Sequence, residues 1–141
     1  MKKIFILVVI TIILINCSMP SIDNNWYNLN EIPNQIINEK SGGAIVSWVI
    51  NNIDYELYAN GFNLAQETLD TGKGNCANMS LLEIALWYKL TGEKGNLIYC
   101  SNSKGLHYCA QLSDKIWESD IKEIYDIIKF DDIAEFIYYR Q

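Results

Sequence analysis

The distribution of apolar residues separates a short N-terminal run from a longer amphipathic part of the chain. Residues 4–15 are apolar apart from Thr11, and Lys2 and Lys3 precede them. This run is shorter than the roughly 20 residues of a membrane-spanning helix. A positive start followed by a short apolar run is typical of a secretory signal peptide, so residues 1–16 are interpreted as one.

The strongest helical pattern lies in the middle of the chain, at residues 77–90. Met79, Leu82 and Leu86 recur at helical spacing, and neighbouring apolar residues widen the stripe until nearly every side of the segment is apolar. Such a helix is expected to be buried at the centre of a domain. Gly92 follows as a natural C-terminal cap.

The segments around this helix predict an α+β domain over residues 32–141, in which the central helix packs on an antiparallel meander. The extended segments span residues 96–101, 106–112 and 115–118. Shorter helices are expected at residues 32–39, 44–53 and 62–69. The tail predicts helix from residue 121 to about 129 and leaves residues 136–139 open between helix and strand.

Composition narrows the class of protein. The chain has 141 residues, which favours a single domain, and a formal net charge of −6. Without residues 1–16, which contain two lysines and no acids, the charge is −6 − 2 = −8. An acidic domain is a poor partner for nucleic acid, so no nucleic-acid binding is expected.

A cysteine stands where the apolar run ends. The segment Leu14-Ile15-Asn16-Cys17 resembles a bacterial lipobox, which implies that Cys17 is lipidated and becomes the mature N-terminus. Residues 17–31 then form the lipidated Cys and a tether, and the protein is expected to be extracytoplasmic and anchored to a bacterial membrane. The alternative is an ordinary signal peptide with an incidental Cys17.

The remaining cysteines are Cys76, Cys100 and Cys109, and their odd number leaves at least one free thiol. That count suits a nucleophile at Cys76 and a possible disulfide between Cys100 and Cys109 on neighbouring strands. The chain has no CxxC or CxxH spacing, so no metal site is expected.

Three residues follow one another in an order suited to thiol chemistry. Cys76 opens the central helix, His107 is the one histidine of the chain, and Asp120 follows the third strand. The N-terminal end of a helix stabilises a thiolate, a histidine takes its proton, and a carboxylate orients the histidine. Each residue also has an ordinary alternative: a buried Cys, a hydrogen-bonded strand His and a helix-capping Asp.

The ordered set Gly74-x-Cys76, His107, Trp117 and Asp120 resembles the transglutaminase-like superfamily, a branch of the papain-like thiol enzymes. The resemblance implies a papain-like core and a catalytic triad of Cys76, His107 and Asp120. It also suggests the upstream aromatic Tyr55 as an oxyanion donor, although Tyr55 can equally be a packed side chain. Nothing matches the acidic calcium loops of large animal transglutaminases, so neither a metal nor a cofactor is expected.

The resemblance implies acyl transfer through a thioester on the cysteine, with a peptide or protein amide as substrate. Small bacterial members of the family are more often hydrolases, which favours a peptidase or amidase. Three alternatives stay open: an amine-accepting protein crosslinker, a non-catalytic lipoprotein that binds a partner with the same fold, and an arylamine-type acyl transferase, which normally needs a longer chain.

Overall fold

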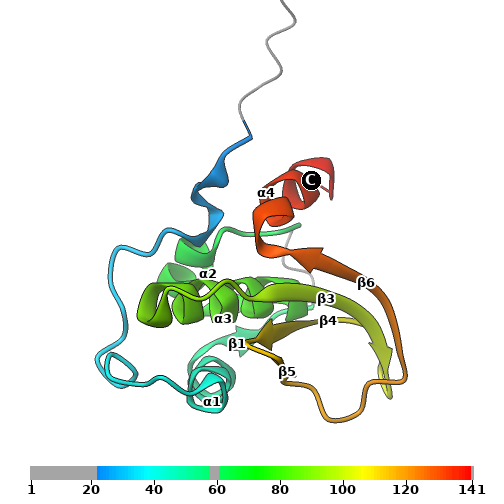
Figure 1. The fold of residues 1–141 in the computed structure, drawn as a ribbon, viewed down its shortest axis with the longest axis horizontal. Coiled ribbons are helices and arrows are strands. Elements are labelled where there is room, and N and C mark those ends of the chain that lie inside the picture. The colour runs from blue at the N-terminus through cyan, green and yellow to red at the C-terminus, as the bar shows by residue number, and fades with distance from the viewer. Residues whose placement is uncertain (1–21, 58–60, 141) are drawn as a thin grey trace, which may run out of the picture.

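The structure is a computed structural model that describes residues 22–57 and 61–140 (Figure 1). The signal peptide expected at residues 1–16 and the lipidation site expected at Cys17 lie outside the described residues. Within the described part of the chain, no helix combines the length and apolar character needed to cross a membrane.

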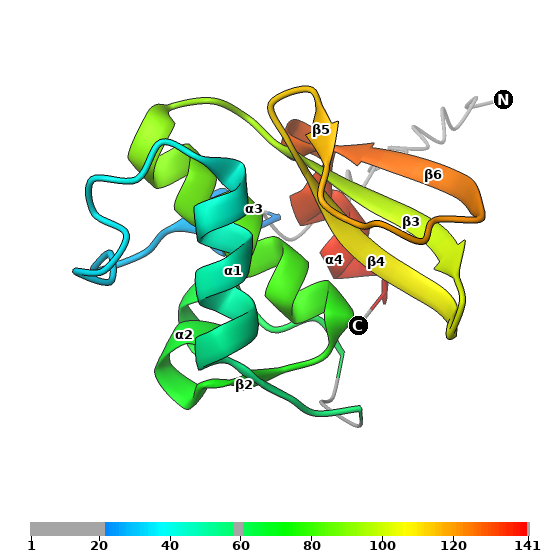
Figure 2. The same ribbon diagram turned by 90° about the horizontal axis from the view of Figure 1, so that it is seen from below.

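A four-stranded antiparallel sheet forms one layer of the molecule, and helices pack on it (Figures 1 and 2). Its strands are β3 (Asn96–Asn102), β4 (Gly105–Leu112), β5 (Lys115–Ile116) and β6 (Glu123–Lys129). Their order across the sheet is β5-β4-β3-β6. The β3 and β4 hairpin is paired from end to end, whereas β5 pairs with β4 at Gln111 and Leu112, away from the hairpin turn.

Helix α3 (Cys76–Thr91) is the centre of the core. The Asn75 side chain caps its start by accepting a hydrogen bond of 3.0 Å from the backbone N–H of Asn78. Gly92 ends it in the left-handed conformation, with φ of 75°. The apolar side chains of α3 that are completely buried are Leu81, Leu82, Ile84, Ala85 and Leu86. The sequence of this helix is apolar on nearly every face because the helix contacts its neighbours on nearly every side.

Shorter elements surround this helix. They are η1 (Asn24–Tyr27), α1 (Gly42–Asn52), α2 (Ala65–Thr71), η2 (Phe130–Asp132) and α4 (Ile133–Arg140). A second, two-stranded sheet joins β1 (Asp54–Tyr55) in parallel to β2 (Lys73–Gly74), which directly precedes α3. This pairing brings the segment after α1 to the N-terminal end of α3 (Figure 2).

The structure confirms the central helix, the meander and the α+β class, but the helix expected at residues 121–129 is wrong. Residues 123–129 form β6, which pairs with β3, and residues 32–39 contain turns instead of a helix. β6 is an edge strand on which Ile124 and Ile127 stay exposed while Ile128 is buried. This spacing of isoleucines mimics a helical stripe, although β-branched residues also favour strands. The helix of the tail, α4, begins after it.

The segment expected to be a tether belongs in part to the folded domain. Trp26 and Leu29 are 2% and 4% exposed. The Trp26 ring lies 5.1 Å from the ring of Phe130, and Tyr27 lies 5.2 Å from Tyr88 near the C-terminal end of α3. Packing of this kind contributes through both area burial and aromatic contacts. The domain therefore includes residues upstream of position 32.

We expect Trp26→Ala to destabilise the domain by about 3–5 kcal/mol, because it leaves a large cavity between η1 and Phe130. Urea unfolding followed by circular dichroism measures this change. Tyr139→Ala is the matched control, since Tyr139 is 67% exposed and its removal should cost about 0.5 kcal/mol or less. Equal stability of the two variants would mean that η1 is not part of the core.

Candidate active site

Cys76 is the first residue of α3, and several hydrogen-bond donors converge on its sulfur. They are the His107 side chain and the backbone N–H groups of Tyr108 and Ala77. Burial of the thiol raises its pKa. The hydrogen bonds and the charge of His107 together lower it by more than burial raises it, so the pKa of Cys76 lies below its ordinary value. The helix N-terminus acts in the same direction.

The first turn of α3 is held against β4 by a buried hydroxyl. The Ser80 Oγ lies 2.7 Å from the Cys76 carbonyl oxygen and 3.2 Å from the Tyr108 carbonyl oxygen. Ser80 is 4% exposed, so this contact is dry. Gly74 allows the close approach of the preceding turn, because a Cβ there would lie 2.9 Å from the Cβ of Asn78. The nucleophile and the histidine strand are thus fixed relative to each other.

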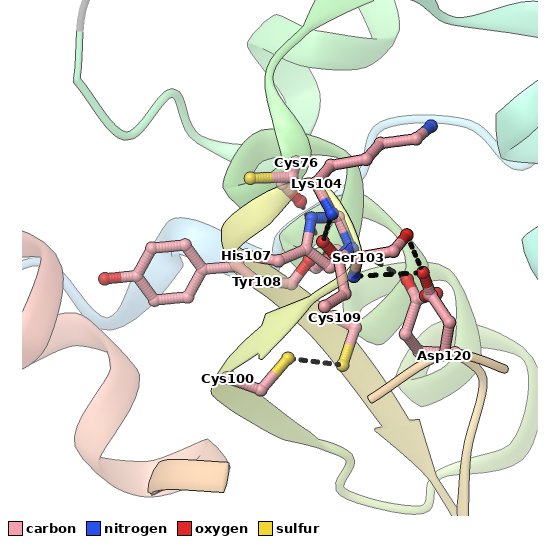
Figure 3. A network of polar contacts seen from close by, with 11 residues as sticks. Cys76, Cys100, Ser103, Lys104, His107, Tyr108, Cys109 and Asp120 are labelled. Carbon is pink, nitrogen blue, oxygen red and sulfur yellow. Dashed lines mark hydrogen bonds and ion pairs between the residues drawn. The ribbon is translucent and has the colours of Figure 1, made fainter. Parts of the chain in front are cut away.

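His107 on β4 lies beside Cys76 (Figure 3), and its imidazole contacts both the thiol and a carboxylate. Its Nε2 lies 2.9 Å from Oε2 of Glu118, which leaves Nδ1 for the hydrogen bond with Cys76. The hydrogen bond to Cys76 is the largest cause that raises the pKa of His107, and the charge of Glu118 adds to it, while burial opposes both. A lowered thiol pKa and a raised imidazole pKa together favour a thiolate–imidazolium pair.

The carboxylate on His107 belongs to Glu118 and not to Asp120, which corrects the triad expected from the sequence. The register of β4 with β5 pairs Gln111 with Ile116, so continued pairing would place residue 120 opposite residue 107. The pairing stops earlier: the last backbone hydrogen bond between the two segments is donated by the N–H of Trp117 to the Ala110 carbonyl. The chain then turns away, and the carboxylate nearer to the end of the strand reaches the imidazole.

Trp117 anchors this end of the strand. Its indole packs on the start of α1, where a Cβ at Gly42 would lie 2.5 Å from the indole Nε1 and a Cβ at Gly43 would lie 3.0 Å from the ring. The Lys115 ammonium lies 4.0 Å from the centre of the same ring. The two glycines at the start of α1 therefore leave room for the indole. Packing of this ring fixes the position of Trp117, which directly precedes Glu118.

Asp120 lies one contact further from the thiol. It accepts hydrogen bonds from the backbone N–H and the hydroxyl of Ser103 in the turn between β3 and β4 (Figure 3). Hydrogen bonds from Glu118 and Ser103 lower the pKa of Asp120 to about 2. Burial and the neighbouring Asp120 raise the pKa of Glu118, although the charge of His107 opposes them. Asp120 thus holds Glu118 and the β3–β4 turn together.

Tyr55 also reaches the thiol. It belongs to β1 and pairs with Gly74, two residues before Cys76, and its hydroxyl makes a hydrogen bond with the Cys76 sulfur. Partial burial, the charge of Cys76 and this hydrogen bond raise the pKa of Tyr55, so the hydroxyl keeps its proton and can donate it in a hydrogen bond. The Tyr55 ring is 57% exposed and lines the cavity of the thiol, and the oxyanion role expected for Tyr55 stays a prediction.

A cavity of about 750 Å³ contains the thiol, and it reveals an acid that sequence reasoning missed. Glu83 lines its wall together with His107 and Glu118, and is only 7% exposed. It lies seven residues after Cys76 and therefore on the same face of α3, two turns away. Burial, and then the charge of Glu118, raises its pKa to about 8, so Glu83 is protonated at neutral pH. A single acidic residue in the middle of a largely apolar helix was the signal available in the sequence.

The possible disulfide between Cys100 and Cys109 is not present in the structure. The two sulfurs lie 3.9 Å apart, and both cysteines are free, whereas a disulfide needs about 2.05 Å (Figure 3). The hairpin register pairs Cys100 with His107 and Cys109 with Ile98, so the two cysteines are diagonal neighbours instead of directly opposed. Burial is the largest cause that raises the pKa of both thiols, which leaves Cys76 as the activated one.

Within residues 22–57 and 61–140, no group of three or more His, Cys, Asp or Glu side chains is placed to hold a metal ion. Comparison of the chain with protein-family models, with curated proteins and with solved structures gives no match.

We expect Glu118→Gln to slow alkylation of Cys76 by iodoacetamide at pH 6 by about five- to tenfold. Loss of the carboxylate lowers the pKa of His107, which in turn raises the pKa of the thiol and leaves less thiolate. The pKa of His107 can be followed by NMR without overlap, because the chain has a single histidine.

Asp120→Asn is the matched control for this prediction. It removes a carboxylate that contacts Ser103 and Glu118 but not the imidazole, so the alkylation rate should stay within about twofold of wild type. A Cys76→Ala background corrects for labelling of other cysteines. A larger effect of Asp120→Asn than of Glu118→Gln would restore Asp120 as the partner of His107.

We expect Glu83→Gln to flatten the pH dependence of stability between about pH 5 and pH 8. The folded pKa of Glu83, about 8, is raised above the unfolded value, so its contribution is fully present below pH 4.5 and is lost as the pH rises towards 8. The difference in Tm between Glu83→Gln and wild type should therefore grow by roughly 10 °C or more over this range. A difference that does not depend on pH would show that Glu83 is ionised throughout.

Proposed function

We propose that this protein is a cysteine-dependent acyl-transfer enzyme that hydrolyses an amide bond in a peptide or protein. The observation that carries the proposal is the continuous contact from the Cys76 thiol through His107 to Glu118, placed at a cavity open to substrate. A nucleophile, a base and a group that orients the base are the parts that covalent acyl transfer requires.

In the proposed reaction, the Cys76 thiolate attacks the carbonyl carbon, and the π electrons move to the carbonyl oxygen. The Tyr55 hydroxyl and the backbone N–H groups at the start of α3 lie beside the sulfur and stabilise this oxyanion. His107 then donates its proton to the leaving nitrogen as the C–N bond breaks, which leaves an acyl thioester on the sulfur.

The second half of the reaction uses the same residues in reverse. The neutral His107 takes a proton from water, the hydroxide oxygen bonds to the thioester carbon, and collapse of the second oxyanion expels the thiolate. Glu118 stabilises the imidazolium in both halves, because its carboxylate stays on Nε2. Neutral Glu83 adds no second negative charge behind this pair at neutral pH.

The proposal includes the transglutaminase-like character that the sequence resembles. Its support is the position of a cysteine at the start of a central helix and of a histidine on the adjacent strand of an antiparallel sheet, which is the plan of a papain-like core. The proposal also keeps Cys17 as a lipid anchor on an extracytoplasmic membrane surface. Loss of detergent-phase partitioning in Cys17→Ser tests that part separately.

We expect p-nitrophenyl acetate to acetylate Cys76 and to be turned over, with a burst of p-nitrophenolate followed by a slower steady rate. Cys76→Ala and His107→Ala should abolish the burst, and Tyr55→Phe should slow it by about tenfold or more because one oxyanion donor is lost. Stopped-flow absorbance and intact-mass analysis measure the two phases. An acetyl-enzyme that forms but never hydrolyses would point to a binding module, and a burst that survives in Cys76→Ala would refute the proposal.

A further inference from the structure

The mouth of the thiol cavity is lined by unusually exposed apolar side chains. Among the described residues, the large apolar or aromatic side chains that are more than 55% exposed are Ile50, Tyr55, Leu57, Leu106 and Tyr139. All of these except Tyr139 line the cavity that contains Cys76. Single exposed apolar residues are common on proteins, but their convergence on one opening marks a binding surface.

These side chains, which we call the apolar rim (Ile50, Tyr55, Leu57 and Leu106), line the cavity of the nucleophile from three segments of the chain. Ile50 comes from α1, Tyr55 and Leu57 from the β1 segment, and Leu106 from β4 immediately before His107. Val46 and Met79 continue the apolar wall inside the cavity. A molecule that covers the rim therefore occupies the cavity that contains the thiol.

The charged groups of the cavity are largely committed to one another. Glu118 is paired with His107, and Asp120 is bonded to Ser103. Lys104 also lines the cavity, but Figure 3 shows its ammonium turned away from the Cys76 sulfur. The strongly exposed side chains that an incoming acyl donor meets at the cavity are therefore apolar or aromatic.

We infer that the site selects polypeptide acyl donors that carry bulky apolar side chains beside the reacting carbonyl, held by the apolar rim. This inference rests on the proposed function and adds the substrate class to it. The occupant is a polypeptide segment because the proposed reaction cleaves a peptide amide, and the rim lines the cavity in which its carbonyl carbon reaches the Cys76 sulfur. Contact with apolar side chains on both flanks of that carbonyl removes the exposed rim from water.

The test uses three dipeptidyl acyloxymethyl ketones that alkylate an active-site cysteine and differ only in the residue next to the reactive group, which is Leu, Glu or Lys. We expect the Leu probe to label Cys76 about tenfold faster than the other two, the scale of discrimination that an apolar pocket provides. Leu57→Ser and Leu106→Ser should each slow the Leu probe by about threefold or more and leave the Glu and Lys probes unchanged. Both residues are exposed, so these variants should fold normally.

Tyr139→Ser is the matched control, because Tyr139 is as exposed as the rim but lies outside the cavity. Its labelling rates should equal those of wild type. Iodoacetamide, which has no side chain, should react equally with wild type and with the rim variants.

Two results would overturn the inference: equal labelling by the three probes, or faster labelling by the Glu or Lys probe. A change from dimer to monomer in Leu57→Ser and Leu106→Ser, without a change in probe rates, would also overturn it and would assign the rim to contact between copies of the chain. Failure of the proposed function gives a different result, since iodoacetamide would then react with Cys76 equally fast in wild type and in His107→Ala.

Discussion

The contact between the first turn of α3 and strand β4 is the constraint on which the site depends. The Ser80 hydroxyl joins the carbonyl oxygens of Cys76 and Tyr108 in a buried position, so helix and strand cannot shift without leaving polar groups unpaired. Cys76 provides one of these two carbonyl groups, and His107 directly precedes Tyr108, which provides the other. The Ser80 hydroxyl and the carbonyl groups of Cys76 and Tyr108 therefore hold the helix and the strand together. The side chains of Cys76 and His107 do not take part in this contact.

Much of this arrangement could be predicted from the sequence, because its signals are local. The apolar run of α3, the glycine before Cys76 and the alternating strands around residue 105 identify the helix, the turn and the hairpin. This order of elements allows His107 to lie near the helix start, where the structure places it. The part that failed depends on where a short strand ends, since one residue decides which carboxylate, Glu118 or Asp120, reaches the imidazole.

The same limit explains the other differences. β6 has isoleucines at a spacing that suits a helix, and only its pairing with β3 shows that it is a strand. The hairpin register sets Cys100 against His107, two positions from the arrangement that a disulfide would need. The docking of Trp26 onto Phe130 joins segments more than a hundred residues apart, which no local pattern can predict.

The burial of Trp26 has a consequence for where the thiol stands if Cys17 carries a lipid. Trp26 lies nine residues after Cys17, so the tether between the lipid and the domain spans about 30 Å at most. The aromatic cluster of Trp26 and Tyr27 packs beside Tyr88, twelve residues or roughly 18 Å along α3 from Cys76. The helix would then act as a spacer, because the tether joins the domain near one end of α3 and the thiol lies at the other end. The thiol would therefore reach only molecules within a thin layer above the lipid surface.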